Sequence, residues 1–305
     1  MTVSVLVTGG AGNIGHEVVQ LLRARGTETV VYDQVAPAAG TTTASEKGDI
    51  CDETRLREVI AKHKVKTIAH LASMLQFGCE MEPAKAVQIN VMGTMAVLEA
   101  ARQSGVKRVV LSGTLATYGG TSDPIDEASP IQADSPLYGV TKLLGEKVAR
   151  RYNALYGMDC RCLRYAAVLS PRKVASAGVA LALSTIFDAA LGKDVVVKGI
   201  AAGERRHYAH TSDIAQGTTL AVLAPQTEHD LFNIAGGDDC YVSFQAVADM
   251  VRLFAPNAGR ISFEGKSGDR GLMNIARARN ELGYQPAFTL ERAVRTIVQS
   301  RLAAA

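Results

Sequence analysis

Tyr138 and Lys142, four residues apart in the stretch YGVTK, form a candidate pair for acid–base chemistry. Residues at this spacing meet on one face of a helix. A tyrosine hydroxyl titrates near 10, so it can act as a base at neutral pH only beside positive charge, which the lysine would supply. The same spacing also fits two polar residues on an exposed helix face, so the rest of the sequence must decide.

A second candidate is the glycine-rich stretch TGGAGNIG, which places glycines at 9, 12 and 15 and includes Asn13 and Ile14. It follows the apolar run VSVLVT (3–8) and opens a helical pattern, the context in which such glycines bind a dinucleotide pyrophosphate. The first glycine permits a tight turn, the second lets the backbone come close to the pyrophosphate, and the third lets the helix pack closely on the strand. A glycine turn without ligand is the alternative. A nucleoside triphosphate loop is disfavoured because no lysine follows Gly15.

Asp33 ends the next apolar run, VVYD, about twenty residues beyond the glycines. A carboxylate at this place can accept hydrogen bonds from the adenosine ribose hydroxyls and would repel a 2′-phosphate. Its neighbours Tyr32 and Gln34 supply no compensating cation. An aspartate at a strand end is common in itself, but together with the glycine motif it predicts NAD rather than NADP as the cofactor.

The elements that must position these residues alternate along the first half of the chain. Helical patterns at about 13–25 and 138–156 and in the segments between the later strands separate short β-rich runs at 29–32, 67–71, 108–112 and 160–165. This alternation predicts an α/β fold, a Rossmann-type doubly wound parallel sheet, with a smaller, mostly α C-terminal substrate domain. We expect residues 1–166 to bind NAD, with a return to the main sheet near 206–224, and residues 167–305 to bind substrate. Within the latter, VVVK and RISF look like short strands.

Composition restricts the function further. The chain has 305 residues, 47% of them hydrophobic, and a formal charge of +3 that is spread evenly, which disfavours nucleic acid or a membrane surface as partner. Five cysteines and the absence of a signal-like N-terminus predict reduced thiols and a cytoplasmic location. Cys160 and Cys162 share one strand face and are expected to be buried structural residues. No His or Cys spacing suggests a metal site.

Taken together, these motifs resemble those of the extended short-chain dehydrogenase/reductases, the NAD-dependent epimerase/dehydratase group. The resemblance covers nearly the whole chain and rests on TGGAGNIG, GDI (48–50), HLAS (70–73), INVMGT (89–94), LSGTLATYGG (111–120), YGVTK and LRY (163–165). It implies that Tyr138 and Lys142 are the catalytic couple and that Thr114 orients the reacting oxygen. Tyr118 would be a pocket or loop tyrosine, and His16 and His70 would be structural.

The resemblance also implies which residues surround the ligands. The adenine would contact Asp49 and Ile50, and the nicotinamide end would lie near Asn90. The full expected cofactor set is Gly9, Gly12, Asn13, Ile14, Gly15, Asp33, Asp49, Ile50, Leu71, Ala72, Ser73, Asn90, Ser112, Tyr138, Lys142, Tyr165 and Val168. The expected substrate set is Ser73, Met74, Thr114 and Arg206, although Arg206 could equally be an ordinary surface arginine.

Three departures from the family pattern narrow the expected reaction. Leu115 and Ala116 replace the Asp-Glu pair of sugar dehydratases. Ala167 replaces an asparagine that meets the diphosphate in nucleotide-sugar epimerases, the Arg-Pro-Gly-Asp element reads KSGD (266–269), and Ala276 replaces an expected aspartate. The chain is also short for a nucleotide-sugar enzyme.

These departures favour an NAD-dependent oxidoreductase that interconverts a secondary alcohol and a ketone on a small sugar, sugar acid or hydroxy acid. The alternative is a sugar or nucleotide-sugar epimerase that keeps its NAD tightly bound. A dinucleotide-sensing protein that has lost catalysis is a third hypothesis, disfavoured by the intact Thr114, Tyr138 and Lys142. A homodimer formed through two long helices is also expected.

Overall fold

The computed structural model describes residues 4–38, 40, 44–119, 123–132, 135–172, 178–266 and 268–305. Val3, Gly120 and Ser267, which belong to motifs discussed above, lie outside the described residues. The strands of the main sheet are β1 (Ser4–Thr8), β2 (Glu28–Asp33), β3 (Ala44–Lys47), β4 (Thr67–His70), β5 (Arg108–Thr114), β6 (Asp159–Tyr165) and β10 (Leu231–Ile234). The helices around it are α1 (Asn13–Ala24), α2 (Glu53–Lys62), α5 (Thr94–Gln103), α6 (Leu137–Tyr156) and α8 (Thr211–Leu223).

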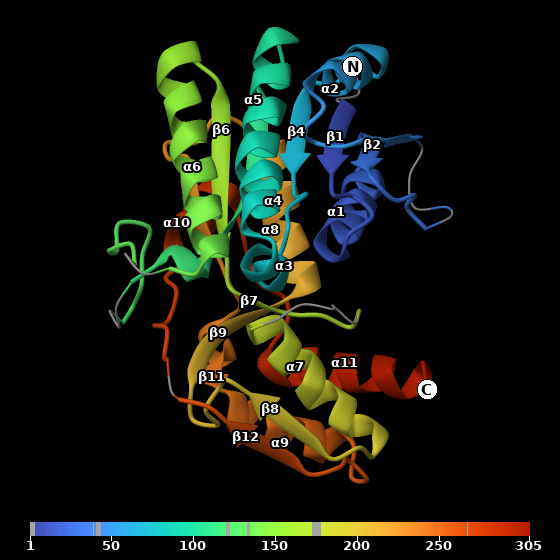
Figure 1. Ribbon diagram of the computed structural model, residues 1–305, viewed down its shortest axis with the longest axis vertical. Helices are drawn as coiled ribbons and strands as arrows, with labels where there is room; N and C mark the ends of the chain where they lie inside the picture. Colours follow the sequence, from blue (N-terminus) through green and yellow to red (C-terminus); the bar gives the residue numbers. More distant parts are fainter. Residues whose placement is uncertain are drawn as a thin grey trace.

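The main sheet has seven parallel strands in the order β10-β6-β5-β4-β1-β2-β3 (Figure 1). The chain builds outward from β1 to β3 and then returns to the other side of β1 with β4. Ligands of such sheets bind at this change of direction, outside the carboxyl ends of the strands. The predicted doubly wound Rossmann-type sheet is therefore confirmed, and its strand order places the glycine turn after β1 at the centre of that edge.

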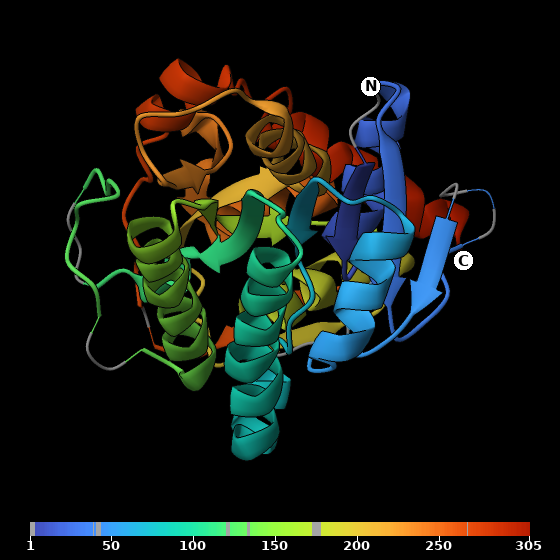
Figure 2. The same ribbon diagram turned by 90° about the horizontal axis from the view of Figure 1, so that it is seen from above.

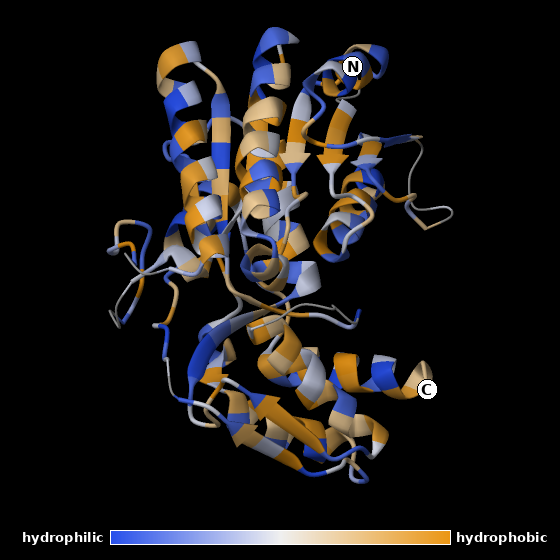
Figure 3. Cartoon of the chain, viewed as in Figure 1, coloured by the Kyte–Doolittle hydropathy of each residue, from blue (hydrophilic) through white to orange (hydrophobic). Residues whose placement is uncertain are grey.

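Helices cover both faces of the main sheet, as Figure 2 shows from above. Helices α2, α5 and α6 pack in a row on one face, and α1 packs on α8 on the other. The strands between them are almost wholly buried, with Val5, Leu6 and Val7 fully shielded. In Figure 3 the covering helices carry both hydrophobic and hydrophilic residues, the pattern of helices that turn one face to a core. Cys160 and Cys162 are buried free thiols on β6, as predicted.

The C-terminal part lies beyond the carboxyl edge of the main sheet (Figure 1). It contains two small sheets: β7 (Ala167–Leu169), β9 (Arg205–His210) and β11 (Tyr241–Ser243) form one, and β8 (Val195–Lys198) pairs with β12 (Ile261–Glu264). The strands expected at VVVK and RISF are thus present. Helices α7 (Val179–Asp188), α9 (Phe244–Phe254), α10 (Ala276–Leu282) and α11 (Leu290–Ala303) complete this part.

The expected return to the main sheet near residues 206–224 takes a different form. The strand in this segment, β9, belongs to the three-stranded sheet, whereas β10, at residues 231–234, joins the main sheet beside β6. Helix α8 does return, because it packs against α1 on one sheet face. The boundary at residue 166 stays a prediction.

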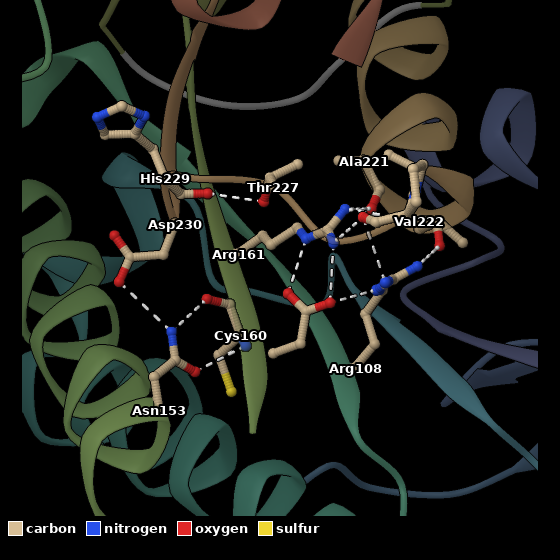
Figure 4. A network of polar contacts seen from close by, with 12 residues as sticks. Arg108, Asn153, Cys160, Arg161, Ala221, Val222, Thr227, His229 and Asp230 are labelled. Carbon is tan, nitrogen blue, oxygen red and sulfur yellow. Dashed lines mark hydrogen bonds and ion pairs between the residues drawn. The ribbon is translucent and has the colours of Figure 1, made fainter. Parts of the chain in front are cut away.

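At the opposite end of the sheet, two arginines hold the end of α8 (Figure 4). Arg161 is fully buried and donates to the carbonyls of Ala221 (3.0 Å), Ala224 (3.3 Å) and Pro225, while a bidentate pair with Asp159 neutralises its charge. Arg108 donates to the carbonyl of Val222 (3.1 Å). Unpaired carbonyls at a helix C-terminus favour cations. This network fixes α8 far from the cavity described below.

No helix in the described part of the chain is long and apolar enough to cross a membrane.

Candidate active site

A cavity of about 990 Å³ opens at the carboxyl ends of the main strands. This is at the upper end of the usual range for ligand pockets, about 300–1,000 Å³. All but two of the predicted cofactor, catalytic and substrate residues line it. Those that do are Gly9, Gly12, Asn13, Ile14, Gly15, Asp33, Asp49, Ile50, Leu71, Ala72, Ser73, Met74, Ser112, Thr114, Tyr138, Tyr165, Val168 and Arg206.

The glycine turn between β1 and α1 has no room for side chains at its first and third glycines. Gly9 has φ +71°, and a Cβ there would lie 2.6 Å from the nitrogen of Ala72. A Cβ on Gly15 would lie 2.1 Å from the carbonyl oxygen of Gly9. No side chain caps the first turn of α1, so its N–H groups face the cavity edge. A tight turn that presents an uncapped helix start is suited to a pyrophosphate.

Asp33 stands at the end of β2, beside this turn. Its carboxylate accepts hydrogen bonds from the backbone nitrogens of Ala11 (3.0 Å) and Val35 (3.2 Å), which fix its orientation. Across the same end of the cavity, Asp49 accepts from the Gln34 amide (3.2 Å). The described residues at this end therefore present two carboxylates and the helix N-terminus, an arrangement that fits an adenosine ribose and its adjoining diphosphate.

Tyr138 lies in the first turn of α6 and is half-buried at the cavity wall. Burial raises the pKa of its hydroxyl to about 12, while a hydrogen bond with Ser73 acts in the opposite direction. The hydroxyl is therefore protonated at neutral pH in the ligand-free protein. It can release this proton, or take one up again, only when added positive charge lowers its pKa.

Lys142 follows one helical turn later and reaches behind the cavity wall. Its Nζ donates to Ser112 Oγ (2.9 Å), and Ser112 Oγ donates to the carbonyl of His70 (3.3 Å). Burial lowers the pKa of Lys142 to about 8. Lys142 does not itself line the large cavity but a small internal space beside it. Its contact with a cofactor stays a prediction, with Ser112 as the group between them.

The remaining residues near Tyr138 come from β5 and β6. Thr114 ends β5, and its Oγ1 accepts from the nitrogen of Ala116 (3.2 Å), which places the hydroxyl at the wall. Tyr165 ends β6, and its hydroxyl shares a hydrogen bond with Thr218 (2.7 Å). Thr218 donates its own proton to the Ile214 carbonyl (2.8 Å), so Tyr165 is the donor in this bond, and burial raises its pKa, so its proton is held there. These positions agree with a role for Thr114 in aligning a substrate oxygen.

Asn90 lies beside the large cavity and not in its wall. It lies in a π-helical turn, Gln88–Gly93, and its amide accepts from the nitrogen of Met74 (2.7 Å) and donates to the Met74 carbonyl (3.0 Å) and to Thr141 (3.1 Å). It lines the small internal space rather than the large cavity. These bonds brace the cavity segment at Met74 from behind, and a direct role toward the cofactor stays a prediction.

Tyr118 and His70 have the structural roles that the sequence favoured. Tyr118 is fully buried, donates to Asn233 (2.6 Å) and lies under the guanidinium of Arg164, 4.5 Å from the ring centre. His70 is held between the hydroxyls of Thr8 (2.8 Å) and Thr94 (3.0 Å). Burial, with the charge of Lys142, lowers the pKa of His70 to about 3, so it stays neutral.

The half of the cavity formed by the C-terminal part is rich in cations. Arg206 pairs with Glu204 and donates to the Gly268 carbonyl (2.5 Å), and Lys266 and Arg270 line the same wall. In the KSGD element Lys266 stands where the family pattern has an arginine, so this position keeps a positive charge. The cavity wall that would contact a diphosphate therefore still carries cations. Leu115 and Ala116 line the wall where dehydratases carry carboxylates.

Sequence reasoning missed several lining residues. Arg270 follows the KSGD element directly, and that neighbourhood could have indicated it. Phe187, Ile200 and Arg301 belong to no motif, so no local signal could have indicated them. Among the described residues, no three His, Cys, Asp or Glu side chains cluster as metal ligands would.

Comparisons with known proteins agree with this geometry. The sequence model of the NAD dependent epimerase/dehydratase family matches residues 5–235. A UDP-glucose 4-epimerase from Rhizobium meliloti (strain 1021) is 33% identical and aligns over 94% of this chain and 93% of its own length. The chain thus spans nearly the whole length of a UDP-glucose 4-epimerase, so its length is no argument against a nucleotide-sugar substrate.

Solved structures share the fold. The NAD complex of a Thermus thermophilus UDP-glucose 4-epimerase superposes with a TM-score of 0.87 at 23% identity, over 99% of this chain and 100% of that one. A partial consensus L-threonine 3-dehydrogenase gives a TM-score of 0.87 at 23% identity, over 99% and 100% of the two chains. The same fold therefore carries both epimerases and dehydrogenases.

Proposed function

The chain belongs to the NAD-dependent epimerase/dehydratase family and is an NAD-dependent enzyme of the short-chain dehydrogenase/reductase type, and we propose that it epimerises a nucleoside-diphosphate sugar at one carbinol carbon. Its relatives support this choice, because a UDP-glucose 4-epimerase aligns with it nearly end to end. The third hypothesis, a dinucleotide-sensing protein that has lost catalysis, is not adopted. The oxidoreductase hypothesis drawn from the sequence holds for the cofactor and class of enzyme, whereas the relatives favour its epimerase alternative.

The observation that carries the proposal is the cationic wall across the cavity from the glycine turn. Arg206, Lys266 and Arg270 lie in the substrate half; Glu204 pairs with Arg206, and the Asp269 carboxylate is also near Arg206. A small hydroxy acid or free sugar needs no such group of cations. A diphosphate does, and arginine and lysine side chains are suited to bind it. We infer that this wall anchors the diphosphate of the substrate.

The sugar would then lie between this anchor and Tyr138. Met74, Leu75 and Leu115 make this region mostly apolar, with Ser73, Thr114 and Gln76 as its polar side chains. Inversion at a carbon requires the ring to present its second face before it is reduced again. A sugar ring that makes few polar contacts can rotate while its diphosphate stays bound.

When bound, NAD supplies the acceptor and donor of the hydride. The protein supplies the group that transfers the proton and the residues that orient the substrate. In this proposal Tyr138 takes the proton of the reacting hydroxyl and later returns it, and Thr114 holds the substrate oxygen. Lys142, held by Ser112, supplies one positive charge a helical turn from Tyr138, but with it in place burial still holds the pKa of Tyr138 at about 12, so further positive charge is needed to lower it. The oxidised nicotinamide ring adds to this charge.

The test is to incubate the purified protein with UDP-glucose and measure UDP-galactose formation while following NADH by absorbance. We expect product without net NADH, NAD released only on denaturation, and loss of turnover in Tyr138→Phe. Lasting NADH formation from a simple alcohol or amino alcohol, with no epimerised sugar nucleotide, would support the dehydrogenase hypothesis instead.

We also propose a homodimer in a reducing cytoplasm. Exposed apolar side chains gather on the outer faces of two neighbouring helical segments, with Met92 and Met95 on one and Val140 and Leu144 on the other. Such a face favours association with a second copy. Sedimentation equilibrium of the wild type and of Leu144→Glu tests it: we expect a dimer and a monomer respectively, and a monomeric wild type contradicts the proposal.

A further inference from the structure

One buried carboxylate in the substrate half has no part in the proposed mechanism. Glu204 directly precedes β9 and lines the cavity, yet its side chain is only 4% exposed. It pairs with Arg206, whose side chain is 11% exposed, and it also accepts a hydrogen bond from the backbone nitrogen of Gly268. Such a group needs a physical reason at a wall that binds an anion, because it carries the same charge as the ligand.

The contacts of Arg206 leave few of its donors for a ligand. Its Nη1 donates to the carbonyls of Arg205 (2.9 Å) and Gly268 (2.5 Å), and its Nη2 pairs with Glu204. A guanidinium has five N–H groups. Among the described residues, these contacts leave the second proton of Nη2 and the proton of Nε for a ligand. A phosphate bound to Nη2 would therefore lie beside the Glu204 carboxylate.

The charge of Glu204 depends on its contact with Arg206. The other titratable groups near it lie on β9 and in the segment after β12, and the full set is Arg206, Tyr208, Lys266, Asp269 and Arg270. Burial raises the pKa of Glu204, the charge of Asp269 acts in the same direction, and Arg206 and the Gly268 N–H oppose them. A ligand anion at Arg206 raises this pKa further, because two like charges then lie side by side.

We propose that Glu204 couples substrate binding to a proton: it is ionised and paired with Arg206 in the ligand-free protein, and it takes up one proton from solvent when the substrate diphosphate binds Arg206. The inference rests on the proposed function, since it takes the ligand to be a diphosphate. Protonation leaves the whole charge of Arg206 to the phosphate. The neutral acid can also donate its O–H to a phosphate oxygen.

This coupling has a fixed sign. The complex holds one proton more than the ligand-free protein, so affinity for the substrate falls as the pH rises. The fall reaches about tenfold per pH unit between the pKa of Glu204 in the ligand-free protein and its pKa in the complex. Glu204 therefore sets substrate affinity, and it leaves the proton transfer at Tyr138 to other groups.

Calorimetric titration of UDP-glucose into Tyr138→Phe saturated with NAD tests the proposal. This variant lacks the proposed acid–base group, so binding is read without turnover, and the charge of the UDP-glucose diphosphate does not change near neutral pH. Binding enthalpies in PIPES and in imidazole, compared between pH 6 and pH 8, give the number of protons taken up, because the two buffers differ in ionisation enthalpy. We expect an uptake that approaches one proton, and an affinity that falls as the pH rises.

Glu204→Gln, made in the same Tyr138→Phe background, keeps the shape of the side chain and an acceptor oxygen but cannot ionise. It should take up no proton, and at pH 8 it should bind UDP-glucose about tenfold more tightly than its parent. A merely structural role for Glu204 would give a loss of affinity and not a gain. Asp269→Asn removes an exposed carboxylate from the same wall, and as the matched control it should keep the proton uptake.

Absence of proton uptake across this pH range would overturn the proposal, and so would an uptake that persists in Glu204→Gln or a loss of affinity in that variant. If Glu204→Gln lowers the melting temperature, the pH dependence of affinity in Tyr138→Phe alone carries the test. Proton uptake through Glu204, in a protein whose wild type forms no epimer, refutes the proposed function alone. Epimerisation of UDP-glucose by the wild type, without linked proton uptake on binding, refutes this inference alone.

Discussion

Replacing Asp33 by asparagine should weaken the discrimination against NADP. The Asp33 carboxylate is half-buried and held toward the cavity by the backbone nitrogens of Ala11 (3.0 Å) and Val35 (3.2 Å). Asparagine has the same shape and can keep one of these two hydrogen bonds. The substitution therefore removes the negative charge and leaves the glycine turn nearly intact.

The size of the effect follows from Coulomb's law. A unit charge on a 2′-phosphate about 5 Å from the carboxylate is repelled by roughly 1 to 3 kcal/mol at an effective dielectric constant of 80 to 20. Loss of one acceptor for Val35 should cost NAD binding on the order of 1 kcal/mol. We therefore expect Asp33→Asn to bind NADPH about 10- to 100-fold more tightly than the wild type, and NADH slightly less tightly.

Fluorescence titration with NADH and NADPH at low ionic strength measures both affinities. Asp49→Asn is the matched control, because Asp49 lines the same end of the cavity but accepts from Cys51 and Gln34 instead. It should change NADPH affinity much less. If Asp33→Asn and Asp49→Asn raise NADPH affinity equally, the general field of the site and not the position of Asp33 selects NAD, and the reasoning fails.

Three further results are expected. Tyr138→Phe should lower kcat roughly a hundred- to ten-thousand-fold while NAD binding, measured by fluorescence, is retained; a smaller loss would assign the proton transfer to another group. Lys142 should be a burden on stability, because burial lowers its pKa from 10.5 to about 8, which corresponds to on the order of 3 kcal/mol. The unfolded chain holds this proton more firmly, so the free energy of unfolding of the wild type should rise between about pH 8 and 10.5 relative to that of Lys142→Met, and parallel urea-derived curves for the two proteins would contradict this. Arg161→Met should destabilise the fold by about 2 to 4 kcal/mol in urea, because buried carbonyls of α8 lose their donor, whereas Arg150→Met, which breaks an exposed ion pair, should cost about 0 to 1 kcal/mol; equal losses would show that the buried network adds nothing.

Part of the fold could be predicted from local pattern alone. The strands at β1, β2, β4, β5 and β6 are apolar runs bounded by turns, and each lies where the sequence indicated. Local pattern predicted neither edge strand: β3 reads ASEK and has no apolar run, and β10 (LFNI) is an isolated short run in the less regular C-terminal third. Their place in the sheet depends on pairing with distant strands, which local pattern does not encode.

The residues predicted for the cofactor site and the predicted catalytic couple could be recognised from sequence alone. Gly9, Gly15, Asp33, Tyr138 and Lys142 lie in short strand–turn–helix or single-helix units, where spacing along the chain fixes geometry. Residues within such a unit keep the same relative positions wherever the unit lies in the fold.

The lining of the C-terminal half of the cavity depends on tertiary structure. Arg301 meets Ser184 across 117 residues, and Lys266 and Arg270 join Arg206 from a separate segment. The same holds for energetics: Lys142 has a pKa of about 8 because other elements bury it, not because of its neighbours in sequence. Such contacts arise when helices and loops from distant parts of the chain close over the sheet edge, and desolvation depends on that closure.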